Sequence, residues 1–117
     1  ALLDTAFHKL RPGSKLVLET INVASWSAFF QSYVRDITHV RPLHPDTLKY
    51  LVTASGFQKV DVTYRSPCAE QTKLEPLPAS TIEGPIQDLA PSLNRNVEKL
   101  NRLLFADQDY AVVGERP

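Results

Sequence analysis

KLVLETIN, residues 15–22, is the stretch around which the rest of the sequence can be arranged. Its three consecutive apolar residues, 16–18, favour a β-strand that is covered on both faces, as in a parallel sheet. We therefore expect a central strand here. Polar side chains that follow such a strand lie where open α/β sheets bind their ligands, so Glu19 and Asn22 are the first candidate site residues.

The composition indicates one ordinary globular domain. The chain has 117 residues, of which 43% are hydrophobic and 22% are charged. Thirteen basic residues balance thirteen acidic ones, so net charge gives no reason to expect a nucleic acid or an anionic membrane as partner. Cys68 is the single cysteine, which excludes an internal disulfide and weakly favours a reducing compartment, and we expect a cytoplasmic location.

The start of the chain already has a helical pattern. Leu3, Phe7 and Leu10 recur at helical spacing, and no capping residue precedes them. The chain also contains no methionine. We therefore expect a fragment of a larger protein.

Periodicity and turn residues predict the remaining elements. The first helix should end at Pro12-Gly13, and a second, capped by Ser25, should cover residues 25–34. A third should begin at Pro45 and end at Gly56-Phe57, with Phe57 packing on Val52. Residues 59–65 alternate between apolar and polar side chains, which predicts a half-exposed edge strand. Residues 66–91 contain five prolines, which predict a long loop. The pattern then predicts a helix over residues 92–105 and a short buried strand over residues 110–114.

The order of these motifs resembles a known family. LRPGSKLVLET, residues 10–20, resembles the turn that leads into the fifth strand of class I S-adenosylmethionine-dependent methyltransferases. ETIN at residues 19–22, DITHVRPLHP at residues 36–45 and SGF at residues 55–57 resemble the continuation in a bacterial branch of that family, and the closing YAVVGERP resembles its seventh strand.

This resemblance implies an α/β, partial Rossmann-like methyltransferase fold. Residues 15–21, 110–115 and 59–65 would be strands five, seven and six of a mixed sheet, in that spatial order, with the seventh strand antiparallel between the other two. Residues 1–117 would be the C-terminal part of one methyltransferase domain, with residues 66–91 as a proline-rich loop insertion. Because an exposed apolar strand edge favours aggregation, we expect the free side of residues 15–21 to pair with further sheet.

The same resemblance implies that the cofactor site lies elsewhere. Members of the family bind S-adenosylmethionine mainly with their first half, through a glycine-rich turn. The four glycines here, Gly13, Gly56, Gly84 and Gly114, are too far apart to form such a turn. We expect no cofactor-binding residue in this chain, and no activity from the chain alone.

The acceptor side of the family's site is commonly built from segments that are present here. Glu19 and Asn22 either orient an acceptor hydroxyl or the far end of the cofactor, or they cap the strand and its turn. His39 is a candidate general base, because an unperturbed imidazole titrates near neutral pH. Alternatively, His39 and His44 join Asp36 in hydrogen bonds that hold the loop together. These three residues are also a weak candidate for a metal site, and we expect no metal.

Two further groups have alternative roles. Arg41 either holds a phosphate or carboxylate of the acceptor or makes a local ion pair. Tyr33 belongs to an aromatic stripe with Trp26, Phe29 and Phe30, which either lines a substrate pocket or packs in the core.

The sequence therefore predicts the acceptor-side half of a small-molecule or sugar O-methyltransferase. Its expected partners are the N-terminal half of the same domain and the acceptor. One alternative is a non-catalytic α/β interaction module that pairs through its exposed strand edge with a partner or a second copy. Another is a nucleotide-dependent enzyme of similar doubly wound design, since fold does not fix function.

Overall fold

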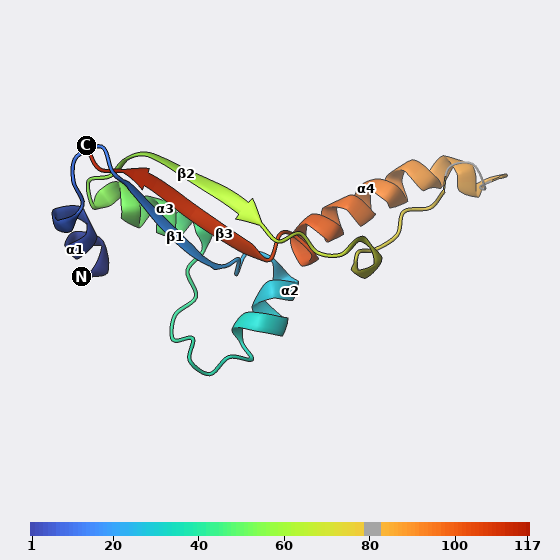
Figure 1. The fold of residues 1–117 in the computed structure, drawn as a ribbon. Helices are drawn as coiled ribbons and strands as arrows, with labels where there is room; N and C mark the ends of the chain where they lie inside the picture. The colour runs from blue at the N-terminus through green and yellow to red at the C-terminus, as the bar shows by residue number, and fades with distance from the viewer. Residues whose placement is uncertain (79–82) are drawn as a thin grey trace.

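The chain folds around a three-stranded sheet, as the computed structural model of residues 1–78 and 83–117 shows (Figure 1). The strands are β1 (Lys15–Ile21), β2 (Gln58–Arg65) and β3 (Asp109–Glu115), in the order β1-β3-β2. The predicted strand order is confirmed. Both ladders are antiparallel, so these three strands form an antiparallel rather than a mixed sheet.

The prediction of a central, doubly covered strand at residues 15–22 is wrong in this chain. β1 lies at an edge of the sheet and its burial alternates, with Leu16 and Leu18 partly buried and Val17 60% exposed. The central strand is β3, in which three consecutive residues beginning at Tyr110 are buried. A run of apolar residues indicates that both faces of a strand need cover, but within the described residues only one face of β1 receives it.

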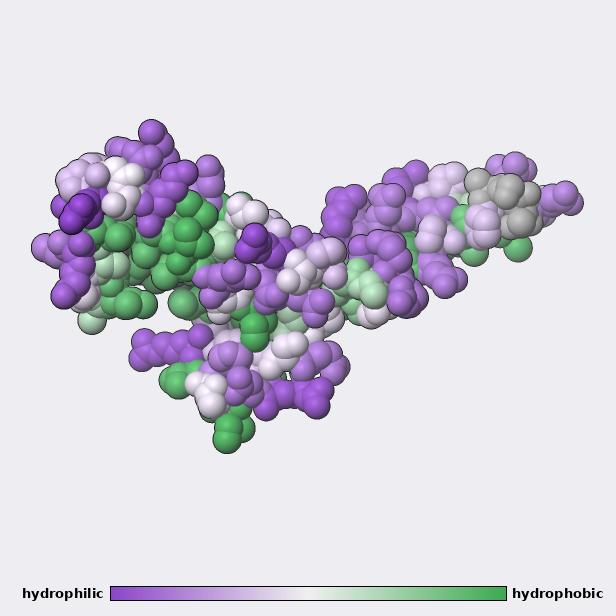
Figure 2. Space-filling view, viewed as in Figure 1, coloured by the Kyte–Doolittle hydropathy of each residue, from purple (hydrophilic) through white to green (hydrophobic). Residues whose placement is uncertain are grey.

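One face of the sheet packs on α1 (Leu2–Lys9) and α3 (Pro45–Ala54). The buried cluster there consists of Leu48, Val52, Phe57, Tyr110 and Val112. The predicted packing of Phe57 with Val52 is confirmed, since both side chains belong to this cluster. Figure 2 shows hydrophobic residues gathered over the sheet and at the tip of the loop below it.

The predicted stop of α3 is confirmed at Gly56, where φ is +105°. A Cβ atom at this position would lie 2.8 Å from Cε2 of Phe7. Glycine is therefore required twice here, for the left-handed backbone and for the close approach of α1.

The predicted helix over residues 25–34 is shorter and changes its winding. α2 (Trp26–Ala28) continues directly into a π-helical turn, η1 (Phe29–Tyr33), which Val34 closes by donating its N–H to the Phe29 carbonyl. Ser25 stands at the N-cap position, but its hydroxyl donates to the carbonyl of Ala106 at 3.1 Å instead of capping the helix. The hydroxyl thereby ties α2 to the connection between α4 and β3.

A long arm extends from the end of the sheet (Figure 1) and accounts for the elongated shape of 65 × 32 × 19 Å. It consists of α4 (Ile86–Leu104) and an extended strap, residues 73–78, that follows a short 3₁₀ turn, η2 (Glu70–Thr72). α4 begins at Ile86 rather than near Ser92, so part of the predicted loop over residues 66–91 is helical. Residues 79–82 of that loop lie outside the described residues.

The early start of α4 is compatible with Pro91. A proline in the second turn removes one backbone hydrogen bond, but it also fixes a φ angle that suits a helix. The sequence prediction used this proline as a boundary, and that is where it failed.

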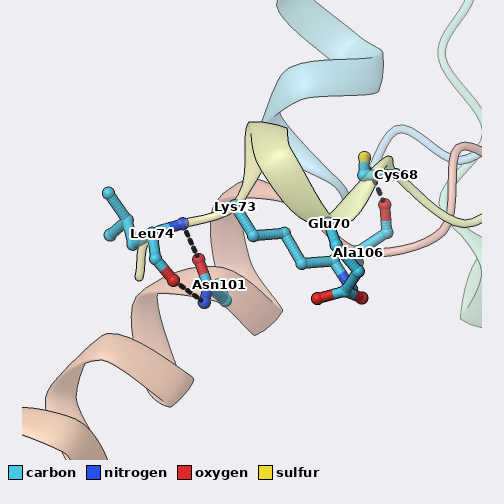
Figure 3. Close-up of polar contacts among 6 residues, drawn as sticks. All are labelled: Cys68, Glu70, Lys73, Leu74, Asn101 and Ala106. Carbon is cyan, nitrogen blue, oxygen red and sulfur yellow. Dashed lines mark hydrogen bonds and ion pairs between the residues drawn. The ribbon is translucent and has the colours of Figure 1, made fainter. Parts of the chain in front are cut away.

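Two asparagines of α4 hold the strap. Asn101 Oδ1 accepts the N–H of Leu74 at 2.8 Å and its Nδ2 donates to the Leu74 carbonyl at 2.9 Å (Figure 3). Asn94 makes the same pair of bonds with Leu77, at 2.8 and 3.0 Å. Seven helical residues rise about 10.5 Å, and three extended residues span roughly 9–10 Å, so helix and strap match in length between the two asparagines.

Candidate functional site

The ends of all three strands meet at the base of the arm, where they border a cleft of about 660 Å³. Its walls include Asn22 after β1, Tyr64 near the end of β2, Asp107 before β3, and Asn101 and Phe105 from the arm. In an α/β sheet the carboxyl ends of the strands are the usual position of a ligand site.

Two of the three charged residues that border the cleft are paired within the chain. Lys73 borders it, but its Nζ lies 3.1 Å from Glu70 Oε1 (Figure 3). Arg102 also borders it and pairs with Glu98 at 3.4 Å. Asp107, the third charged residue of the wall, makes no ion pair among the described residues, so the cleft keeps one carboxylate beside the aromatic rings of Tyr64 and Phe105. Such a wall suits an uncharged polar molecule better than an anion.

Asn22 is 1% exposed and closes the turn that follows β1. Its Nδ2 donates to the Asp107 carbonyl at 2.8 Å, and its Oδ1 accepts the N–H of Ala24 at 3.1 Å. The amide is thus engaged on both sides by backbone groups, while the residue still contributes to the cleft wall.

Glu19 lies on the exposed face of β1 and reaches across the sheet. Its Oε2 is 3.5 Å from Arg65 Nη1 on β2, although β3 lies between the two strands. Ala111 of β3 is opposite Glu19, and its small side chain leaves room for the ion pair to pass over it. Both partners are about half exposed, so the pair is worth at most about 1 kcal/mol.

Tyr33, Asp36 and His39 form a small polar and aromatic group, here called the histidine stack, at the end of η1. The rings of Tyr33 and His39 are parallel, with centroids 4.5 Å apart. His39 Nδ1 lies 3.2 Å from the Tyr33 carbonyl oxygen, and His39 Nε2 lies 3.8 Å from Asp36 Oδ2. Among the described residues, the buried hydroxyl of Tyr33 has no hydrogen-bond partner.

Asp36 is held as an anion beside the imidazole. The hydroxyl and the N–H of Thr38 donate to Asp36 Oδ1 at 2.6 and 2.9 Å, and these two bonds are the main reason that its pKa lies below the ordinary value. The neighbouring His39 lowers the pKa of Asp36 further.

The aromatic stripe divides between two environments. Phe29 stacks on Tyr33 with centroids 5.7 Å apart, and both are half-buried. Trp26 and Phe30 are 48% and 56% exposed and, together with Phe105, line an apolar groove of about 430 Å³. The stripe therefore contributes to packing on one side and to an open apolar surface on the other.

The other predicted site residues lie elsewhere. His44 caps α3, since its Nδ1 accepts the N–H of Asp46 at 3.1 Å, and Arg41 is exposed in the loop before it. Thus the structure brings Tyr33 and His39 together, but Glu19 and His44 occupy separate positions. In the part of the chain that the structure describes, no group of three or more His, Cys, Asp or Glu side chains could hold a metal ion.

Sequence reasoning missed most of the cleft wall. Tyr64 could have been found, because it lies near the carboxyl end of a predicted strand. Asn101 and Asp107 had no recognisable signal, since their position depends on how the arm joins the sheet.

No described helix is both long and apolar enough to cross a membrane.

Comparisons with known proteins give one similar structure. No family model matches the chain, and a search of curated proteins found no match. A solved structure described as a SAM-dependent methyltransferase from Archaeoglobus fulgidus is 34% identical, with a TM-score of 0.86 over 97% of this chain. The match covers 50% of the solved chain, so the present chain spans about half its length. The chain therefore has a partial methyltransferase fold.

Proposed function

We propose that this chain is the acceptor-side, carboxyl-terminal half of an S-adenosylmethionine-dependent methyltransferase. The observation that carries the proposal is the similarity over 97% of this chain to half of a solved SAM-dependent methyltransferase. The strand order β1-β3-β2 agrees with strands five, seven and six of that fold.

A complementary half would complete the sheet at β1. The outer edge of β1 has no strand beside it among the described residues, and Val17 is 60% exposed on its second face. An N-terminal half that paired with this edge would supply both the missing strand and the cover that the apolar run 16–18 requires.

The cofactor belongs mainly to that other half in this proposal. A glycine-rich turn that receives the cofactor needs several glycines close together, and the glycines of this chain are isolated. When bound, S-adenosylmethionine supplies an electrophilic methyl group. The described residues would hold and activate the acceptor.

The histidine stack is the proposed place where the acceptor loses its proton. If Nδ1–H of His39 donates to the Tyr33 carbonyl, Nε2 keeps the lone pair and can accept a proton from an acceptor hydroxyl. The anionic Asp36 lies beside Nε2 and would stabilise the imidazolium that forms. The Tyr33 ring stacks on the imidazole with centroids 4.5 Å apart and would hold it in place for this proton transfer.

We further propose a small uncharged acceptor, such as a sugar or another hydroxylated metabolite. The pairing of both cationic residues at the cleft, Lys73 and Arg102, and the exposed faces of Trp26 and Phe30 support this class, because aromatic faces stack on the apolar faces of sugar rings. Of the predicted acceptor contacts, Glu19 and Arg41 have exposed side chains that would contact an acceptor. The Asn22 amide and Nδ1 of His44 already bond to backbone groups of this chain, so these two residues would contribute only their remaining surface. A cytoplasmic location agrees with the single free thiol of Cys68.

The test is His39→Gln in a protein that contains both halves, measured by transfer of a radiolabelled methyl group to a panel of hydroxylated acceptors. We expect the rate to fall about 100-fold or more, because general-base catalysis contributes roughly 10²–10⁴. Binding of S-adenosylhomocysteine should not change. His8→Gln is the matched control, since His8 is exposed on α1.

Two results would contradict the proposal. His39→Gln activity within twofold of the parent would remove the general base. Tight calorimetric binding of S-adenosylhomocysteine to the 117-residue chain alone would place the cofactor site in this half. The alternative of a non-catalytic module that pairs through the β1 edge predicts no methyl transfer even when the complementary half is present.

A further inference from the structure

The arm carries an apolar seam that the strap leaves open. The seam residues are spaced by three, four, three, four and three positions along α4: Ile86, Leu89, Leu93, Asn96, Leu100 and Leu103. This is the spacing of the a and d positions of a coiled coil. The five apolar members are each between 44% and 60% exposed.

The strap lies on the neighbouring flank of α4 and does not cover the seam. It is bound by Asn94 and Asn101, each one position after a seam residue. On the same flank Ala90 is 7% exposed and Val97 is half-buried. The apolar surface of α4 is thus wider than a single strap requires, and the uncovered part has the geometry of a helix–helix contact.

We propose that the seam pairs with the same seam of a second copy, with the two α4 helices antiparallel. The seam is self-complementary in this orientation. A twofold axis near residues 94 and 95 sets Ile86 against Leu103 of the second copy, Leu89 against its Leu100, and Leu93 against its Asn96. Every seam residue then has a seam partner.

Charge favours the antiparallel orientation. Asp88 and Lys99 lie on the flank of α4 opposite the strap. The antiparallel arrangement sets each Lys99 on the same side of the seam as Asp88 of the second copy, about two residues apart along the helix, and extended side chains can form two symmetric ion pairs at the rim. A parallel arrangement would set Lys99 beside the apolar Leu104 of the second copy and would place both sheet bodies at the same end.

The seam is short, since 19 helical residues extend only about 28 Å. One of its positions is polar, because Asn96 lies at its centre. A contact of this size belongs with weak interfaces, so we expect a reversible dimer with a dissociation constant on the order of 10 µM. The inference does not depend on the proposed methyltransferase activity.

Analytical ultracentrifugation of the protein that carries the full chain tests the inference, over about 1–200 µM. The parent should show a monomer–dimer equilibrium. Leu93→Glu should weaken dimerisation at least 30-fold, and circular dichroism should show that α4 remains folded. Asn96→Leu should strengthen dimerisation about tenfold, because it replaces the polar centre of the seam with an apolar contact.

A charge exchange tests the orientation without disturbing the seam. Lys99→Asp and Asp88→Lys should each weaken dimerisation roughly three- to tenfold, and the double variant should restore it. A monomer at 200 µM, or a dimer that Leu93→Glu leaves unchanged, would overturn the inference; in the second case the open edge of β1 becomes the expected contact. A dimer that depends on Leu93 but not on the charge exchange would overturn the antiparallel arrangement.

Discussion

Removal of the Tyr110 hydroxyl should uncouple the loop before α3 from the central strand. Tyr110 is fully buried in β3, and its hydroxyl donates to the carbonyl of Leu43 at 2.6 Å. Tyr110→Phe leaves that carbonyl without this donor and should lower the free energy of unfolding by about 1–3 kcal/mol near pH 7. The loss should be visible in urea denaturation followed by circular dichroism.

The pH dependence makes this prediction sharper. Burial, with a smaller contribution from Tyr64, raises the pKa of Tyr110 to about 12, whereas the unfolded chain should release the proton near pH 10. The folded state therefore keeps a proton that the unfolded state loses, and this stabilisation is complete below pH 10 and disappears between pH 10 and 12. Two pKa units correspond to about 2.7 kcal/mol, so the parent should lose up to this amount relative to the variant.

The two stability curves should thus converge, or cross, as the pH approaches 12. Tyr50→Phe serves as the control, because Tyr50 is 70% exposed and its removal should change stability by less than about 0.5 kcal/mol. A difference between parent and Tyr110→Phe that stays constant up to pH 12 would refute the argument from burial. A cost below about 0.5 kcal/mol near pH 7 would refute the role of the hydrogen bond.

Three other substitutions have defined outcomes. Gly56→Ala should destabilise the fold by about 2 kcal/mol or more, because the substitution strains a φ of +105° and brings a methyl group against Phe7. Thermal unfolding measures the loss, and a decrease in Tm of less than about 1 °C would contradict the prediction. Asn101→Ala should release the strap at Leu74, so that this amide loses most of its protection in hydrogen exchange while the amides of β3 keep theirs; equal protection in parent and variant would argue against the asparagine pairing. Asn22→Ala should cost roughly 2–3 kcal/mol of unfolding free energy in urea, because two backbone groups lose their partner, and a neutral effect would show that the turn after β1 does not need the amide.

Much of the fold was predictable because its signals are local. Gly56 and Phe57 mark the end of α3, and the alternation in residues 59–65 marks an edge strand, since both patterns report on neighbours a few residues away. The strand order, which the structure confirms, was predicted from the resemblance of several motifs in sequence, from residues 10–20 to the closing YAVVGERP, to a methyltransferase family.

What the sequence could not show depends on contacts between distant segments. Ser25 has the form of a helix cap, yet its hydroxyl bonds to Ala106, which lies far along the chain. The burial of residues 15–22 depends on which faces of the sheet are covered. Apolar residues indicate that a face needs to be covered, but they do not show whether this chain or another part of the protein covers it. The candidate site follows the same rule: Tyr33 and His39 are close in sequence and stack. Glu19 was predicted from its place after a strand and His44 from its place on the loop of His39, and neither place determines where the side chain lies.

The length match between strap and helix restricts how the arm can change in evolution. Seven residues of α4 correspond to three residues of the strap between the two asparagines, so a single insertion in either segment would shift one asparagine away from its backbone partner. Indels in homologous arms should therefore be compensated in pairs, about two helical turns for every three strap residues. Arm length would then vary in discrete steps, and each added step would bring its own asparagine.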